Sequence, residues 1–123
     1  MKLSVIIPAH NEEGSVKETL YILYSTLLNN RIDHEIVVIN DNSSDKTSEI
    51  AKNKGVRVVH RSVNAGAGAA RRTGIKAATG EVIVMLDADD TYEAKDIPSL
   101  LIHFPEFDQV NGARTSEKGN PIP

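Results

Sequence analysis

The chain has 123 residues, with 17 acidic and 14 basic side chains, a formal net charge of −3 and no cysteine. A small acidic excess argues against a nucleic-acid partner, and the lack of cysteine excludes disulfides and thiolate metal sites. The first apolar run is too short for a secretory signal, and no stretch approaches the roughly 18 apolar residues of a membrane span. We therefore expect one soluble domain in the cytoplasm.

An apolar run at 3–9 predicts a short strand buried on both faces, followed by a helical pattern over 15–28. Ser15 and Glu18 fit a capping box at the start of this helix. Its apolar side chains recur every three or four residues and so share one helix face: Val16, Leu20, Leu23 and Leu27.

Residues 34–40 predict a second strand, residues 43–55 a second helix and residues 56–60 a third strand. Ser44 is the expected N-cap of the second helix, and Gly55 is the residue expected just after its end.

The glycine- and alanine-rich segment 64–80 predicts a turn that runs into a third helix, which Gly80 would stop. Residues 81–87 predict a fourth strand, and residues 94–104 predict a helix whose boundary an internal proline leaves open. A fifth strand is expected within 108–114.

Strand and helix patterns alternate along the whole chain, which favours a parallel α/β sheet with helices on both faces. Ligands of such sheets bind beyond the carboxyl ends of the strands. Polar clusters at 8–13, 40–45 and 87–91 each follow a predicted strand. We therefore expect these three clusters to meet at one edge of the sheet.

The cluster after the fourth strand contains three aspartates. If the backbone stays extended, Asp87 and Asp89 share a face, with Cα atoms about 7 Å apart, while Asp90 points the other way. A divalent cation such as Mg²⁺ or Mn²⁺ would remove the repulsion between the two facing carboxylates. The alternative is that these aspartates cap a helix and lie in a solvated loop.

The other clusters leave their roles open. Asp41 could accept hydrogen bonds from a base or ribose, or belong to a turn, whereas Asp45 fits a helix-capping role better. His10, taken alone, is typical of a loop residue. The small residues of 64–80 suit either a phosphate-binding turn or close helix–sheet packing, with Arg71 a phosphate partner or a surface charge.

The segments "LSVIIPAHNEE", "EIVVINDNSSDKT", "NAGAGAARRTGIKAATGE" and "VIVMLDADD" together resemble, in order and spacing, the inverting family 2 glycosyltransferases. This resemblance implies a Rossmann-like GT-A fold. The segment "VNGAR" is similar to one found in the branch that includes dolichol-phosphate mannose synthases, which transfers sugars to polyprenyl phosphates.

The resemblance also implies roles for single residues. One set would bind the nucleotide of a GDP- or UDP-sugar, with Asp41 on the base and the arginines near the phosphates: Pro8, His10, Glu12, Asp41, Arg71, Asp87 and Arg114. Asp87 and Asp89 match the pair that binds Mn²⁺ or Mg²⁺, with Asp89 as the direct ligand.

Three residues depart from the family pattern. Asn40 stands where an aspartate is usual, His10 replaces a common tyrosine, and Thr91 replaces the glutamine of the polyprenyl-phosphate branch. The resemblance implies that residues 1–114 bind the donor, whereas 115–123 is a loop at which an acceptor-binding half would begin. The general base is then expected beyond Pro123. A lipid acceptor would place transfer at the cytoplasmic face of a membrane.

Two alternatives remain at this point. Residues 82–91 resemble the D-x-D-x-T strand end of haloacid dehalogenase-type phosphatases, although no later acidic pair follows. The chain could also be a module that binds a nucleotide-sugar without catalysis. A nucleotidyltransferase would need a glycine- and arginine-rich loop after the first strand, which residues 8–14 do not provide.

Overall fold

The computed structural model describes residues 2–63 and 65–101, together with the backbone of 109–111. Strands and helices alternate along these residues: β1 (Leu3–Ala9), α1 (Val16–Asn29), β2 (His34–Asp41), α2 (Thr47–Asn53), β3 (Arg57–Arg61), α3 (Ala67–Ala77), β4 (Val82–Met85), α4 (Thr91–Leu101) and β5 (Gln109–Asn111).

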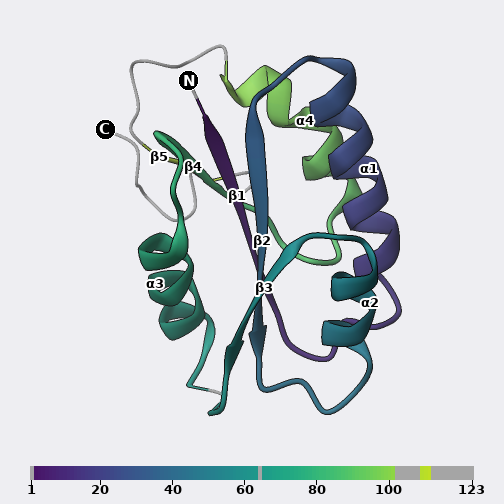
Figure 1. The fold of residues 1–123 in the computed structure, drawn as a ribbon, viewed down its shortest axis with the longest axis vertical. Coiled ribbons are helices and arrows are strands. Elements are labelled where there is room, and N and C mark those ends of the chain that lie inside the picture. Colours follow the sequence, from purple (N-terminus) through teal and green to yellow (C-terminus); the bar gives the residue numbers. More distant parts are fainter. Residues whose placement is uncertain (1, 64, 102–108, 112–123) are drawn as a thin grey trace.

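The strands form one sheet in the order β3-β2-β1-β4-β5, and every neighbouring pair is parallel. The chain builds outward from β1 in both directions, so the strand order reverses between β1 and β4. Such a reversal opens a crevice at the carboxyl ends of the strands. This confirms the predicted parallel α/β fold, with α3 on one face of the sheet and α1, α2 and α4 on the other (Figure 1).

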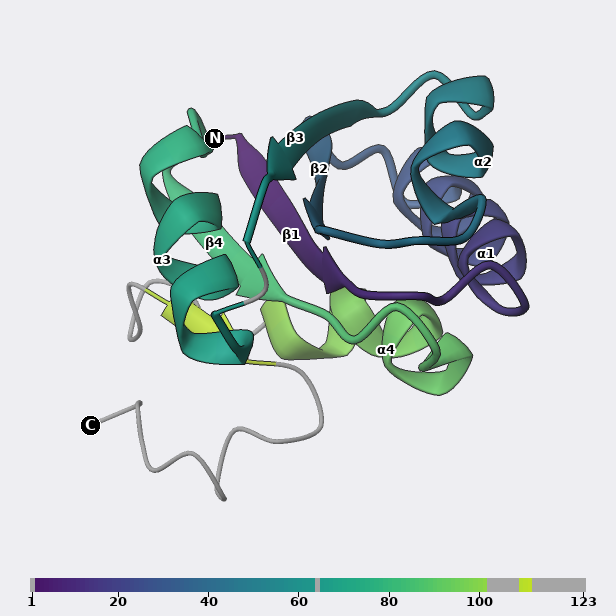
Figure 2. The same ribbon diagram turned by 90° about the horizontal axis from the view of Figure 1, so that it is seen from below.

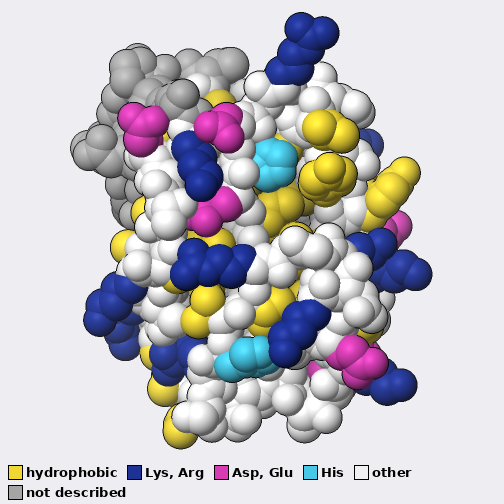
Figure 3. All heavy atoms as spheres, in the orientation of Figure 1, with side chains coloured by type: hydrophobic (Ala, Val, Ile, Leu, Met, Phe, Trp, Pro, Cys, Tyr) yellow, Lys and Arg dark blue, Asp and Glu magenta, His cyan; other side chains and the backbone are white. Residues whose placement is uncertain are grey.

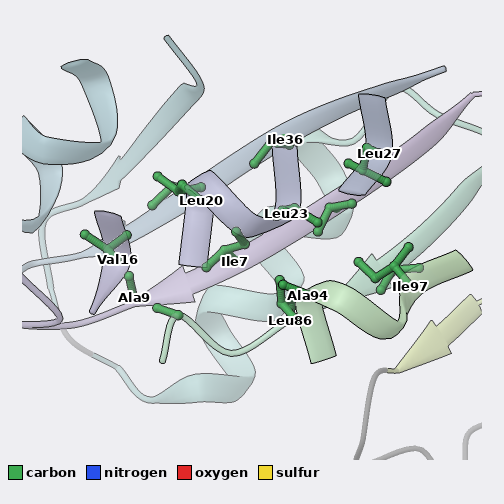
Figure 4. Packing of buried hydrophobic residues seen from close by; sticks show 14 of the residues in the cluster. Ile7, Ala9, Val16, Leu20, Leu23, Leu27, Ile36, Leu86, Ala94 and Ile97 are labelled. Atoms are coloured by element: carbon green, nitrogen blue, oxygen red, sulfur yellow. The ribbon is translucent and has the colours of Figure 1, made fainter. Parts of the chain in front are cut away.

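The larger core lies between the sheet and the three helices α1, α2 and α4. Alternate residues of β1, such as Val5 and Ile7, point into it and meet one apolar stripe of α1. That stripe is the one predicted from the spacing of the apolar residues. Figure 4 shows these side chains filling the space between sheet and helices: Ile7, Ala9, Val16, Leu20, Leu23, Leu27, Ile36, Leu86, Ala94 and Ile97.

Among the described residues, α3 is the helix that covers the second face, and the core there is smaller. Ile6, Ile39 and Met85 pack there against Ala70. Helix and sheet approach closely because Gly74 has no side chain: a Cβ atom at this position would overlap Cγ2 of Ile6. Seen from below, α3 lies across the strands from α1 and α2 (Figure 2).

Several local predictions about helix ends need correction. Ser15 makes no side-chain capping bond, because its hydroxyl instead donates to Glu12 Oε1 at 3.4 Å. Helix α2 begins at Thr47, later than an N-cap at Ser44 would place it. The prediction for Gly55 is confirmed, since it follows α2 with a φ of 79°.

Gly80 does not stop α3, which ends at Ala77. It is needed for another reason: a Cβ atom there would lie 2.7 Å from the carbonyl oxygen of Lys2 and 2.7 Å from Ser4 Oγ. The connection from α3 to β4 therefore passes directly against the start of β1.

No helix in the described part of the chain is long and apolar enough to cross a membrane. On the face shown in Figure 3, acidic and basic side chains are mixed with hydrophobic ones.

Candidate functional site

A cavity of about 230 Å³ lies at the carboxyl ends of β1, β2 and β4, beside the first turns of α3. Three strand ends, the loop after β1 and one helix contribute its walls: Pro8, Ala9, His10, Glu12, Asp41, Ala67, Ala70, Arg71 and Asp87. The cavity sits where the strand order reverses, which is the position expected for a ligand site in this architecture.

The alternation of side chains along the strands explains why acidic groups reach this cavity. Residues two apart in a strand share one face of the sheet. Asp41 comes two residues after Ile39, and Asp87 comes two residues after Met85. Both aspartates therefore continue the apolar rows that pack against α3, and they enter the cavity just where those rows end.

Six of the seven residues predicted to bind a nucleotide line this one cavity: Pro8, His10, Glu12, Asp41, Arg71 and Asp87. The seventh, Arg114, lies outside the described residues. Asp89, predicted as a metal ligand, is exposed and does not belong to the described cavity wall. The structure thus brings together three clusters that are far apart in the sequence.

Asp41 is held from two sides. Arg61 donates from Nε to Asp41 Oδ1 at 2.9 Å, and this ion pair is largely shielded, with the Asp41 side chain 6% exposed. His10 Nδ1 lies 2.8 Å from the Asp41 carbonyl oxygen. Because a carbonyl only accepts, the Nδ1 of His10 must carry the proton in this contact. The His10 ring is therefore anchored at the rim of the cavity.

The loop after β4 differs from the predicted extended backbone. The chain turns at Ala88 and Asp89, and the N–H of Asp90 bonds to the carbonyl of Asp87 at 3.2 Å. The extended backbone on which a shared face for Asp87 and Asp89 depended therefore ends after Asp87, because the chain turns here to begin α4 at Thr91.

The turn gathers a different trio of carboxylates. Oxygen atoms of Asp87, Asp90 and Glu93 lie within 4.8 Å of one another. Asp90 Oδ1 accepts the N–H of Glu93 at 2.9 Å, as expected of an N-cap residue. Asp90 therefore matches the capping alternative for this loop, and this bond to the first turn of α4 brings Asp90 close to Glu93. Carboxylate oxygens are also suitable ligands for a hard divalent cation.

The pKa of Glu12 is raised, partly by the negative charges of neighbouring carboxylates. Burial is the largest cause, and the nearby charge of Asp89 raises the pKa further. The charges of Asp45 and Asp87 add smaller increases, whereas a hydrogen bond from Ser15 lowers the pKa. Both aspartates of the D-x-D segment thus act on a side chain in the cavity wall, although Asp89 is outside that wall. A cation between them would relieve this repulsion.

The loop after β1 and the loop after β2 are fastened to each other. Asn11, in a left-handed conformation with a φ of 54°, accepts at Oδ1 the backbone N–H of Ser44 at 2.8 Å and that of Asp45 at 3.3 Å. In return, the N–H of Glu13 bonds to Asp45 Oδ2 at 3.1 Å. These bonds hold the loop that carries His10 and Glu12 against the loop that follows Asp41.

Asn40 does not reach the cavity. Its side chain lies 3.1 Å from His60 Nδ1 and accepts the N–H of Ser43 at 3.2 Å. The side chain that stands where the family usually has an aspartate therefore contacts β3 and the neighbouring turn, and it lies outside the described cavity wall.

Sequence reasoning missed two residues that organise the site. Arg61 pairs with Asp41, and Asn11 joins the two loops. A signal for Arg61 exists in the sequence, since a basic residue follows one predicted strand and an acidic residue follows another. Recognising the pair requires knowing that the two strands are neighbours.

The matches to known proteins decide the family. The model of the family described as "Glycosyl transferase family 2" matches residues 4–122. The chain belongs to this family. This membership argues against the phosphatase alternative, because the resemblance to phosphatases covers only residues 82–91 whereas the family model covers 4–122.

Two curated relatives illustrate the match. The chain is 38% identical to an uncharacterised protein of Methanocaldococcus jannaschii, over 95% of this chain and 48% of that protein. It is 36% identical to a dolichol-phosphate mannosyltransferase of Pyrococcus furiosus, over 82% of this chain and 29% of that protein. The chain therefore spans less than half the length of either relative.

Solved structures agree with the fold. The chain is similar to glucosyl-3-phosphoglycerate synthase from Mycobacterium tuberculosis, with a TM-score of 0.70 and 29% identity, over 83% of this chain and 39% of that chain. That synthase was crystallised with Mn²⁺, uridine diphosphate and glucosyl-3-phosphoglycerate. Another structure of the same enzyme holds Mn²⁺, UDP-glucose and phosphoglyceric acid.

Proposed function

We propose that this chain is the donor-binding part of a glycosyltransferase that takes a sugar from a UDP- or GDP-sugar. The observation that carries the proposal is the single cavity in which six predicted residues meet, five from the three polar clusters and Arg71 from α3. Membership of the glycosyltransferase family and the UDP-bound synthase of similar fold support it.

The base is assigned to the Asp41 side of the cavity. An ionised carboxylate only accepts hydrogen bonds, so it selects a base that presents an N–H group. Uracil offers its ring N3–H and guanine its N1–H. Pro8 and His10 line the same cavity, and His10 contacts the Asp41 carbonyl, so a flat base could lie against their rings.

The diphosphate is assigned to the start of α3. Ala67 and Ala70 line the cavity without bulk, so an anion can approach the amide groups of the first helical turn. The positive end of a helix dipole attracts phosphate, and Arg71 adds a full positive charge beside it. Under this assignment, the small residues of α3 have both of the roles that the sequence left open: they let a phosphate approach, and they let the helix pack closely on the sheet.

A divalent cation, Mn²⁺ or Mg²⁺, fits the carboxylates after β4. Asp87 lines the cavity, and Asp89 is near enough to raise the pKa of Glu12, so these two are the proposed ligands. Asp90 Oδ1 accepts the backbone N–H of Glu93 at the start of α4. When bound, the cation would supply positive charge against the departing nucleoside diphosphate.

The acceptor is proposed to carry a phosphate group. The name of the Pyrococcus relative supports a polyprenyl phosphate, which would place transfer at the cytoplasmic face of a membrane. The family resemblance adds that the transfer inverts the anomeric centre. We propose that the acceptor site and the general base lie in the part of the relatives' length that this chain does not match.

Calorimetric titration of UDP and GDP, each with and without Mn²⁺, tests this proposal. We expect one of them to bind with Mn²⁺, and Asp87→Asn to weaken that binding by at least about tenfold, since even indirect disturbance of metal ligands has effects of this size. Asp96→Asn, an exposed acid on α4, is the matched control and should bind normally. If neither nucleotide binds under any condition, the proposal is wrong.

A further inference from the structure

The ion pair that holds Asp41 is part of a chain of contacts across three elements. Arg61, at the end of β3, reaches Asp41 at the end of β2 through its Nε. Its Nη1 donates to Thr73 Oγ1 on α3 at 2.6 Å. The Thr73 hydroxyl in turn donates to the carbonyl of Ala69 at 3.1 Å, one turn earlier in the helix.

The sheet geometry places these side chains together. Asp41 and Arg61 are register partners of the parallel pair β2 and β3, so both side chains point to the face covered by α3. Arg61 uses two separate nitrogens in a fixed planar fork, which a single ammonium group cannot reproduce. The contacts therefore hold the Asp41 carboxylate in one orientation.

Arg61 contacts Asp41 from outside the cavity wall. Asp41 belongs to the cavity wall, whereas Arg61 stands outside the set of described residues that form it. The ion pair engages Oδ1 of Asp41, and Oδ2 makes no hydrogen bond to another described residue. One oxygen is thus committed to the protein, and the other remains for a ligand in the cavity.

We infer that Arg61, supported by Thr73, is a positioning residue that sets which nucleotide base the site accepts. This inference rests on the proposed function. A carboxylate fixed at one oxygen presents a single acceptor at a fixed place, which suits the ring N–H of uracil or guanine. Cytosine and adenine present a bare ring nitrogen there and are rejected, because two acceptors would face each other. A carboxylate free to turn would discriminate less.

The chain contains a matched control for this pair. Arg57, on the same strand and the same face, lies 3.8 Å from Glu35 on β2. This second pair sits at the opposite end of the sheet from the cavity, and neither residue belongs to the cavity wall in the described part of the chain. Arg57→Lys therefore reproduces the chemical change of Arg61→Lys at a distance from the base.

The experiment measures base preference by calorimetry in the presence of Mn²⁺. The probes are UDP or GDP, whichever the unmodified chain binds more tightly, its counterpart without the ring N–H (CDP for UDP, ADP for GDP), and inorganic pyrophosphate. We expect Arg61→Lys to lower the preference for the N–H base by at least about tenfold while pyrophosphate binding stays the same. Arg57→Lys should leave all three affinities unchanged.

Thr73→Val keeps the ion pair but removes the second anchor of Arg61, so it should lower the base preference in the same direction and by less. If Arg61→Lys does not fold, Thr73→Val tests the inference in its place. Unchanged base preference in both variants, or an equal loss for nucleotide and pyrophosphate, would overturn the role of Arg61. If the unmodified chain binds no nucleotide, the proposed function fails first and the inference falls with it.

Discussion

The aspartates after β4 have different surroundings although they are nearly adjacent in the chain. Asp87 lines the cavity, Asp89 is exposed in the turn, and Asp90 caps α4. Composition alone cannot separate these roles, because all three offer the same carboxylate. Their contacts do separate them, and each assignment has a measurable consequence.

Substitution of the neighbouring aspartates distinguishes metal binding from helix capping. Asp89→Asn should weaken Mn²⁺-dependent nucleotide binding by at least about tenfold, because the cation loses a charged ligand. Asp90→Asn should leave binding nearly unchanged, since asparagine is an equally good N-cap residue. Titration of both variants with the preferred nucleotide and Mn²⁺ checks this. The reverse pattern would mean that Asp87, Asp90 and Glu93 are the metal ligands.

Single residues of the cavity wall were predictable where a family motif or a strand end marks them. Asp41 and Asp87 end apolar runs, and that position by itself indicates a ligand-facing edge. Arg61 was not predictable, because its importance depends on the register of β2 against β3. Asn11 was not predictable either, since its role arises from contacts between two loops.

At the scale of elements, α3 depends on how closely it approaches the sheet. Gly74→Ala should lower the free energy of unfolding by about 1–3 kcal/mol, because the added methyl group overlaps Ile6 in a packed core. Gly68→Ala is the control in the same helix: its Cβ would meet only Arg72 Nη1, at 3.6 Å. That variant should be stabilised by about 0.5–1 kcal/mol.

Urea denaturation of both glycine variants measures these changes. Equal effects at the two positions would show that the helical glycines matter for conformational freedom alone and that the close contact has no energetic weight. Nucleotide binding by Gly74→Ala should also weaken, because displacement of α3 would move Ala70 and Arg71 away from the cavity.

The identity of the elements was largely predictable, and their ends were not. The apolar stripe of α1 is visible in the spacing of its residues, and the strands are continuous apolar runs. Caps failed because the Ser15 hydroxyl donates backward to Glu12, three residues earlier, and the Ser44 hydroxyl donates to Asn11 in another loop. A local contact therefore replaced the expected cap at Ser15, and a tertiary contact replaced it at Ser44.

At the scale of the whole molecule, Glu35 joins parts of the sheet at the end away from the cavity. It accepts hydrogen bonds from Ser4 Oγ and from the N–H of Thr79, each at 2.6 Å. Burial alone would raise the pKa of Glu35, but these hydrogen bonds and the charge of Lys2 outweigh it, so the pKa lies below its ordinary value of 4.5. The folded state therefore favours the ionised form.

This lowered pKa predicts a pH dependence of stability. Because the unfolded chain binds the proton more readily, the contribution of Glu35 is complete above the ordinary pKa of 4.5 and is lost as the pH falls through the lower folded value. Glu35→Gln should destabilise the protein at neutral pH, and its difference from the unmodified chain should shrink below that pKa. Glu49→Gln, an exposed acid on α2, should show no such difference. Chemical denaturation across this pH range measures both.

The architecture as a whole was predictable because strand and helix patterns alternate without interruption. The order of the strands was not, since several arrangements of parallel strands satisfy the same alternation. Membership of glycosyl transferase family 2 and the fold follow from the matches over nearly the whole chain, whereas the donor and acceptor remain proposals.

The most direct test of the central claim is diffraction from crystals grown with Mn²⁺ and the preferred nucleotide, recorded near the manganese absorption edge. We predict an anomalous peak beside Asp87, with the base next to Asp41 and the diphosphate at the start of α3. A nucleotide bound elsewhere, or a manganese peak distant from Asp87, would contradict the account.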